Sequence, residues 1–158
     1  MTLTESLLPR LSDWRPAGAG RHSWAESFPA EGWLVQLSAD KADSLSCLLW
    51  ELTLTRLGEP PAGLTLKDWA AGVAGRVGGL MEPLAVHEVD DTRAEAILRS
   101  TAPARKGEAL AYYEVRLSGL STAVVRRFAA GRTEPGRSQV SYALTHEALA
   151  KLAGDVAG

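Results

Sequence analysis

The feature that most constrains the fold of this chain is a single amphipathic segment between two stretches of strand-like alternation. Thr65 to Met81 repeats apolar residues at helical spacing, whereas Trp33–Leu57 before it and Leu84–Tyr142 after it alternate apolar and polar residues. Antiparallel sheets that are covered on one face alternate in this way. The order predicts an α+β fold, in which an antiparallel sheet of about six to eight strands packs against a central helix over residues 65–81.

The central helix has a clear start and an unusual composition. Thr65 is a suitable N-cap, and Asp68 three residues later completes a pair that resembles a capping box. Apolar residues share one face, among them Leu66, Trp69, Val73, Val77, Leu80 and Met81. The glycines Gly72, Gly75 and Gly79 project from roughly the opposite face. This glycine face is either exposed or packed closely within the fold, or it is a surface that the backbone of a partner approaches.

The flanking segments complete a single domain over residues 1–158. Before the helix, Leu48, Trp50, Leu52 and Leu54 are predicted to point to one side of a strand. Trp33, Trp50 and Trp69 are therefore expected in the core. A short C-terminal helix is predicted over residues 145–153, and residues 1–20 are predicted to be irregular or briefly helical, because Pro9 and Pro16 interrupt them.

Charge and composition exclude several classes of function. Of the 158 residues, 46% are apolar and 23% are charged, as in soluble globular domains, and the net charge is only −2. Nucleic-acid binding needs clustered Lys and Arg, so it is not expected. One local excess contains Arg126, Arg127, Arg132 and Arg137, interrupted by Glu134. It is either solvated strand and loop charge or an anion site.

Cysteine usage and the absence of targeting signals favour the cytoplasm. Cys47 is the only cysteine, so no internal disulfide can form, and a reducing compartment is favoured. The thiol lies beside Leu48 and Leu49, where a buried position is expected. The first residues do not resemble a signal peptide, and no apolar run is long enough to cross a membrane.

No catalytic, metal-binding or cofactor-binding pattern is present in the sequence. His22, His87 and His146 lie in separate predicted elements, and His146, next to a helix cap, is expected to be exposed. The densest group of potential ligands runs from His87 to Asp91, but on a regular strand His87 and Glu88 face opposite sides. We therefore expect no catalytic residue, no metal and no cofactor, and the chain is not predicted to be an enzyme.

Charged residues gather on the predicted polar face of the sheet. Glu51, Glu95 and Glu114 fall there with Arg99, Arg116 and either Arg126 or Arg127. This pattern indicates either cross-strand ion pairs on a solvated face or a recognition surface, since Tyr112 and Phe128 are interleaved with the charges. Trp14 and Trp24 are candidates for an exposed patch. The candidate interaction surface therefore comprises Trp14, Trp24, Gly72, Gly75, Gly79, Tyr112, Glu114, Arg116 and Arg127.

The order of the predicted elements over Arg21–Ala153, with Leu64-Thr-Leu-Lys-Asp-Trp-Ala70 opening the helix, resembles the Mog1/PsbP-like superfamily. Bacterial members of that superfamily include small chaperone-like domains of secretion systems. The resemblance implies a non-enzymatic domain that holds protein partners on its sheet and helix surfaces. It transfers no functional residue to a position in this sequence.

These observations predict a soluble protein-interaction module, either chaperone-like or an accessory subunit of a larger bacterial assembly, whose partner is another protein. The alternative is a small-molecule-binding or hydrolytic domain with a pocket between sheet and helix. An antiparallel sheet with an uncapped edge can also pair with a second copy, so the sequence allows a homodimer.

Overall fold

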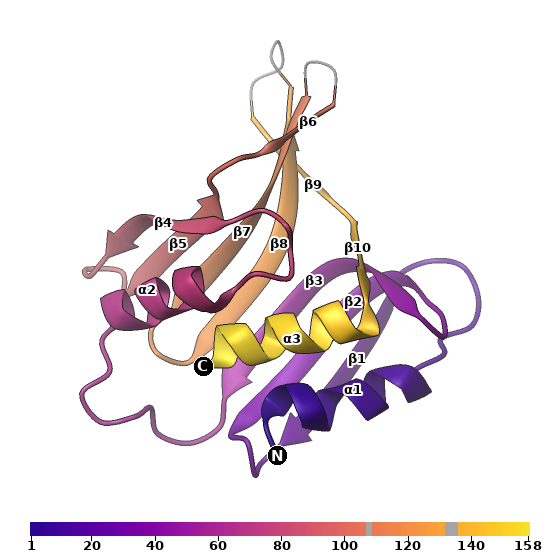
Figure 1. Cartoon of the computed structure of the whole chain (residues 1–158), viewed down its shortest axis with the longest axis horizontal. Helices are drawn as coiled ribbons and strands as arrows, with labels where there is room; N and C mark the ends of the chain where they lie inside the picture. Colours follow the sequence, from indigo (N-terminus) through magenta and orange to yellow (C-terminus); the bar gives the residue numbers. More distant parts are fainter. Residues whose placement is uncertain (107–108, 132–135) are drawn as a thin grey trace.

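The computed structural model describes residues 1–106, 109–131 and 136–158, which form three helices and one ten-stranded antiparallel sheet (Figure 1). The α+β class and the antiparallel sheet are therefore confirmed, although the sheet has more strands than predicted. In chain order the elements are α1 (Leu3–Asp13), β1 (His22–Phe28), β2 (Trp33–Ala42), β3 (Ser46–Arg56), α2 (Leu66–Arg76), β4 (Leu84–Asp90), β5 (Glu95–Ser100), β6 (Ala104–Lys106), β7 (Ala109–Ser118), β8 (Thr122–Ala130), β9 (Ser138–Val140), β10 (Tyr142–Thr145) and α3 (His146–Ala157).

The sheet runs in the order β1-β2-β3-β8-β7-β5-β4, and three short strands join its interior. Strand β6 pairs with β7, β9 pairs with β8, and β10 pairs with β3. Strands β3 and β8 pair with each other only over Leu52–Thr55 and Thr122–Val125 and then diverge. The segment from Ser138 to Thr145 fills this fork, because β9 continues the ladder of β8 while β10 continues that of β3.

Two side chains satisfy backbone groups inside the fork. The Tyr142 hydroxyl donates to the carbonyl of Val125 at 2.9 Å, and Gln139 Nε2 donates to the carbonyl of Trp50 at 2.9 Å. Carbonyls at a point where two strands separate would otherwise lack partners, which is costly when they are buried. Tyr142 is buried and contacts Tyr113 edge to face, with ring centroids 5.4 Å apart.

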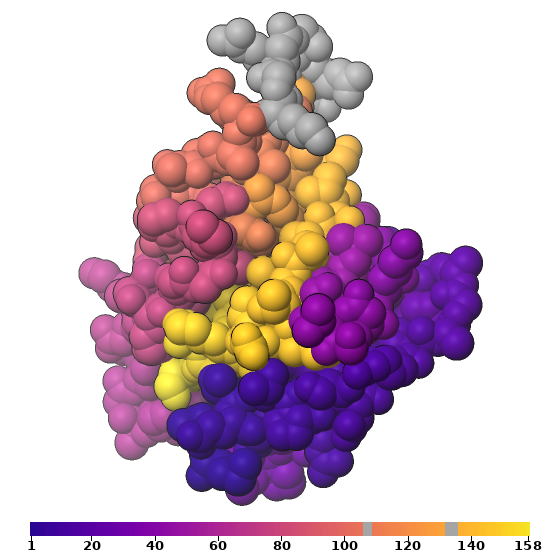
Figure 2. Space-filling model, turned by 45° about the vertical axis from the view of Figure 1, so that its right-hand side comes forward, coloured from indigo at the N-terminus to yellow at the C-terminus, as the bar shows by residue number. Residues whose placement is uncertain are grey.

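The three helices lie on the same side of the sheet (Figure 1). One continuous apolar core fills the space between the helices and the sheet. Leu7 and Leu11 of α1 and Leu149 and Leu152 of α3 are buried in this core. Figure 2 shows the atoms of α1 directly against those of α3. In α2 the Trp69 ring lies 6.1 Å from that of Trp33, and its Nε1 donates to the carbonyl of Val156 at 3.0 Å.

The helix boundaries differ from the predicted ones in informative ways. Thr65 is the N-cap of α2 as expected, and its hydroxyl accepts a hydrogen bond from the amide of Asp68 at 3.1 Å. The helix nevertheless ends at Arg76 and not at Met81, because Val77 adopts an extended conformation before Gly78 and Gly79, which are poor helix formers. Met81 is consequently 94% exposed, which contradicts its predicted place on the apolar face.

The two terminal segments are more regular than expected. Residues 3–13 form helix α1, although Pro9 lies inside it, and Thr2 and Glu5 make a full capping box at its start. Helix α3 continues to Ala157, four residues beyond the predicted end at 153. Among the described residues, no helix is long and apolar enough to cross a membrane.

A bulge in the β2–β3 ladder overturns the predicted orientation of Leu48 and Trp50. Ser38 pairs with Glu51 but Ala39 pairs with Leu49, so Trp50 has no counterpart and the alternation changes phase. Cys47 and Leu49 therefore join Leu52 and Leu54 in the core. Trp50 is only half-buried, and the Arg21 guanidinium stacks 3.9 Å from its ring centre.

Two glycines allow a matched test of the helix packing. At Gly154 of α3 an added Cβ would overlap the Thr4 hydroxyl of α1, whereas at Gly75 of α2 it would meet open space. We expect Gly154→Ala to lower the free energy of unfolding by about 1–2 kcal/mol through overpacking. Gly75→Ala should raise it by up to about 1 kcal/mol through helix propensity. Urea denaturation measures both changes.

The double variant Gly154→Ala with Thr4→Ala serves as the control and should recover part of the loss, because the overlapping hydroxyl is gone. Equal effects of Gly154→Ala and Gly75→Ala would contradict close packing between α1 and α3.

Candidate functional site

The candidate functional site lies on the open face, which we define as the surface of the sheet turned away from the three helices. Strand β7 distributes its side chains between the two faces by simple alternation. Val115 and Leu117 enter the core, whereas Tyr112, Glu114 and Arg116 lie on the open face, as predicted. Glu114 pairs across the strands with Arg99 of β5 and Arg126 of β8, so guanidinium groups flank it on both sides.

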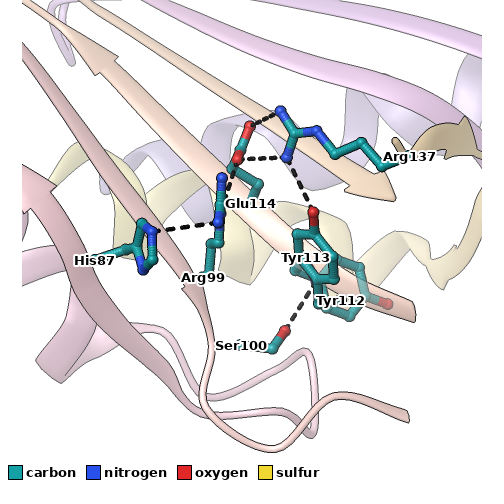
Figure 3. Close-up of polar contacts among 7 residues, drawn as sticks. All are labelled: His87, Arg99, Ser100, Tyr112, Tyr113, Glu114 and Arg137. Atoms are coloured by element: carbon teal, nitrogen blue, oxygen red, sulfur yellow. Dashed lines mark hydrogen bonds and ion pairs between the residues drawn. The ribbon is translucent and has the colours of Figure 1, made fainter. Parts of the chain in front are cut away.

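Glu114 is the centre of this site, because it is only 2% exposed although it lies on the open face. Arg99 Nε lies 3.1 Å from Glu114 Oε1. Arg137, which precedes β9, contacts both carboxylate oxygens, with Nη1 2.7 Å from Oε1 and Nη2 3.4 Å from Oε2 (Figure 3). A buried carboxylate is tolerated when it is paired and hydrogen-bonded in this way. The sequence pattern did not identify Arg137 as the partner of Glu114.

The charge of Glu114 is maintained by these partners. Burial alone raises the pKa of the Glu114 carboxyl, but the hydrogen bonds and positive charges of Arg137 and Arg99 outweigh burial, and the pKa lies below its usual value. Hydrogen bonding to Glu114 in turn raises the pKa of Arg137. Glu114 is therefore ionised at neutral pH and anchors the two arginines. A general acid would instead need a raised carboxyl pKa.

An aromatic pair adjoins this charged cluster. The Tyr112 and Phe128 rings lie 6.1 Å apart, and the Arg137 guanidinium stacks 3.6 Å from the Phe128 ring centre. Arg137 also donates to the Tyr112 hydroxyl at 3.1 Å. Phe128 is only 8% exposed, yet it does not belong to the core under the helices. Arg137 therefore connects the carboxylate to the aromatic pair. We name Arg99, Tyr112, Glu114, Phe128 and Arg137 the Glu114 cluster.

A shallow hollow of about 580 Å³ occupies another part of the open face, over strands β1, β2, β3 and β8. Its rim carries Glu51, whose Oε2 lies 2.7 Å from Arg126 Nε. Small and polar residues line the rest, including Ser23, Ala25, Gln36, Ser38 and Thr53. Trp24, Leu37 and Val124 add apolar surface, so the hollow offers both polar and apolar contacts.

The predicted excess of arginines is divided between the two faces. Arg127 lies on the helix side, where it contacts Glu82 at 3.0 Å and stacks 4.2 Å from the Tyr113 ring centre. Arg126 and Arg137 lie on the open face, each paired with a carboxylate. Arg132 and Glu134 are outside the described residues. Arg126, Arg127 and Arg137 thus do not share one anion site, which was one interpretation of the sequence.

A second bulge corrects the prediction that His87 and Glu88 face opposite sides. The β4–β5 register shifts between Val86 and Glu88, so His87 is the extra residue. Arg99 Nη1 lies 3.3 Å from His87 Nε2, while Glu88 shares a small hollow with Arg116 and Glu95 on the same face. Within the described ranges, no group of three His, Cys, Asp or Glu side chains could hold a metal ion. The Nε atom of Arg116 is buried and has no hydrogen-bond partner among the described residues.

The other candidate residues lie apart from the Glu114 cluster. Trp14 and Trp24 are half-buried and form a pair, with ring centres 6.3 Å apart, beside the edge strand β1. The three glycines do not share a helix face, because Gly79 follows the end of α2. Gly72 is covered by the Arg76 side chain, and Gly79 lies next to α3. Only Gly75 faces open space.

His146 and Cys47 are both buried, and the expectation that His146 is exposed is wrong. His146 is 4% exposed because it begins α3 directly after β10, where its amide donates to the Leu45 carbonyl at 2.9 Å. Burial and the nearby Arg15 lower the pKa of His146, while Asp43 and Glu147 act in the opposite direction. Burial raises the pKa of the Cys47 thiol to about 11, with a smaller contribution from Asp43, and the expected buried position of this thiol is confirmed.

Comparisons with known proteins give no match. A scan against protein-family models finds none for this chain, and searches of curated proteins and of solved structures find none either.

The variant Glu114→Gln tests the central ion pair. Removing the charge leaves two guanidiniums without their anion, so we expect the free energy of unfolding at pH 7 to fall by about 2–3 kcal/mol. Glu51→Gln, in a half-exposed pair on the same face, should cost no more than about 1 kcal/mol. Because the folded pKa of Glu114 is lowered, its contribution is complete above the unfolded value of about 4.3. The contribution is lost as the pH falls through the lower, folded value.

Urea titrations between pH 7 and pH 3 measure the difference in unfolding free energy between wild type and Glu114→Gln. This difference should become smaller as the pH falls. A constant gap between wild type and Glu114→Gln would contradict the assigned charge.

His146 should make stability depend on pH in a second, separate range. Because the folded pKa of His146 is lowered, the unfolded chain binds the proton more readily, so stability falls as the pH drops below the unfolded value of about 6.5. One such group contributes a slope of at most about 1.4 kcal/mol per pH unit. His146→Gln should remove this slope between pH 7.5 and pH 5.5 in urea titrations. His22→Gln, at a half-exposed position, is the control. If wild type, His146→Gln and His22→Gln showed the same dependence of unfolding free energy on pH, His146 would not be its source.

Proposed function

We propose that this chain is a non-enzymatic module that binds another protein through the open face of its sheet, as a chaperone-like domain or as an accessory subunit of a larger bacterial assembly. The observation that carries the proposal is the Glu114 cluster. It holds two part-exposed guanidiniums against an aromatic pair, on the same face of the sheet as a hollow of about 580 Å³.

The chemistry of the cluster supports recognition. Arginine, tyrosine and tryptophan are the residues most enriched at the energetic centres of protein interfaces. Arg137 is held by Glu114, Tyr112 and Phe128 together, so it would lose little further conformational freedom when a partner binds. Arg21 over Trp50 adds a second stacked pair. A pre-ordered surface of this composition suits a protein partner.

The packing favours this function over the small-molecule or hydrolytic alternative. That alternative requires a pocket between sheet and helices, but there Trp69, Val73 and Leu149 belong to a continuous core. The hollow of about 580 Å³ lies on the opposite face, and it is open and shallow. The buried carboxyl of the site has a lowered pKa, which suits ion pairing better than acid catalysis.

We further propose that the chain is a Mog1/PsbP-like domain that works in the cytoplasm. The order of elements supports this, with strands before a helix that Thr65 caps, then antiparallel strands and a closing helix. A single, buried cysteine suits a reducing compartment. The proposed partner is a protein, and nucleic acid is not proposed as one because the arginines of the open face are paired with carboxylates.

Site-specific photo-cross-linking in the native cell tests the proposed function. A photoreactive residue in place of exposed Gln36, at the hollow, should capture one dominant protein, whereas the same residue in place of exposed Lys67 on α2 should not. Ser38→Arg, which fills the hollow, should weaken binding of that protein by at least about tenfold. Ala71→Arg on α2 is the matched control and should have no effect. Cross-linking of equal strength from both positions would exclude the open face as the interface.

A further inference from the structure

We propose that the chain forms a homodimer in which β1 pairs antiparallel with β1 of a second copy, joining two sheets across a two-fold axis. Among the described residues, β1 pairs only with β2, so its other edge presents free backbone amides and carbonyls (Figure 1). Free edges of this kind are templates for pairing with a further strand. The proposal does not depend on the protein partner proposed above.

The two outer strands of the sheet differ in how well their edges are protected. Strand β4 carries a bulge at His87, and Glu88 and Asp90 add charge, which are common devices against edge pairing. Strand β1 pairs with β2 over seven consecutive residues without a register shift. It contains no proline and no lysine, and the exposed side chains of Ser23, Ala25 and Ser27 are all small. Strand β1 has one acidic side chain, Glu26, which is paired with Arg10, so β1 is the less protected edge.

The sequence of β1 is complementary to itself in one antiparallel register. With Ala25 opposite Ala25 of the second copy, Ser23 lies opposite Ser27 on the open face, because the pattern of small residues is symmetric about Ala25. A strand that is related to its copy by a two-fold axis must pair in such a symmetric way. No large or charged side chain would meet its own equivalent on that face.

The helix side of β1 is also complementary in this register. Trp24 would lie opposite Glu26 of the second copy, whose carboxylate is 3.4 Å from Arg10 in the same chain. The indole would thus lie beside a guanidinium, a favourable arrangement. A hollow of about 330 Å³ at this edge is lined by Arg10 together with Asp13, Trp14 and Glu26. Two such hollows would face each other with charges of both signs, which suits a second copy of this chain.

Dimerisation would have a consequence for the open face. Ser23 and Ala25 line the 580 Å³ hollow as well as the edge, so the hollows of two copies would adjoin across the axis. The dimer would present two Glu114 clusters on one continuous sheet. A partner with two binding segments could then engage both, which increases apparent affinity without new contacts.

Sedimentation velocity of the purified full chain, over a concentration series up to about 100 µM, tests the proposal. We expect a monomer–dimer equilibrium, and Ala25→Lys should raise the dissociation constant at least tenfold, because two like charges would meet at the axis. Ala85→Lys, at an exposed position on β4, is the matched control and should dimerise as the wild type does. A monomer throughout the series, or loss of the dimer only in Ala85→Lys, would overturn the proposal.

Cysteine variants test the register. In Ala25→Cys the two new thiols would face each other with Cα atoms about 5 Å apart, within disulfide range, so mild oxidation should yield a covalent dimer. In Ser23→Cys the equivalent atoms would be about 14 Å apart, because four residues of about 3.4 Å each separate them along the strand, and cross-linking should be at least tenfold slower. Cross-linking of Ser23→Cys at the same rate would exclude this register. Both readouts use the purified chain alone, so they stay independent of the Gln36 cross-linking that tests the protein partner.

Discussion

The hydrogen bond from the Tyr142 hydroxyl to the carbonyl of Val125 marks the constraint on which the rest of this structure depends. At that carbonyl β8 leaves β3, and a sheet that splits must find new partners for the backbone groups it frees. The segment from Ser138 to Thr145 supplies them, since it pairs first with β8 and then with β3. The same segment brings Arg137 to one side of the sheet and His146, with helix α3, to the other. The fork therefore links the open face to the helix layer.

On the open face, a buried charge organises its surroundings. Glu114 would be unstable alone in a position that is only 2% exposed, and its two arginines supply the opposite charge that it needs. Arg137 in turn covers Phe128, which keeps an aromatic ring out of water although no helix lies above it. A surface assembled in this way is polar on the outside and ordered underneath. Protein interfaces combine order and polarity in a similar manner.

Regular periodicity in the sequence was sufficient to predict the class of fold, the antiparallel sheet, the cap at Thr65 and the division of β7 between a core face and a polar face. It failed where the backbone leaves the regular pattern. The bulges at Trp50 and His87 each insert one residue, and a single inserted residue shifts the alternation, so an assignment that is right on one side of the bulge is wrong on the other. The end of α2 at Arg76 was missed because the apolar spacing continues through Val77 and Leu80, which remain buried outside the helix. The partnership of Glu114 and Arg137 depends on a three-residue strand, β9, which is too short to leave a periodic signal.

The contact between α1 and α3 has a consequence for how the chain is made. Leucines of α1 are covered by the helix that is synthesised after all ten strands, and the Gly154 backbone lies against Thr4. While the ribosome produces the intervening sheet, the apolar side of α1 has no permanent cover, and β3 still lacks the β10 ladder. Nascent chains whose native contacts join residues far apart in the sequence fold slowly, so their apolar surface stays exposed for longer. The apolar side of α1 in this domain is therefore fully covered only after the C-terminal helix has been made.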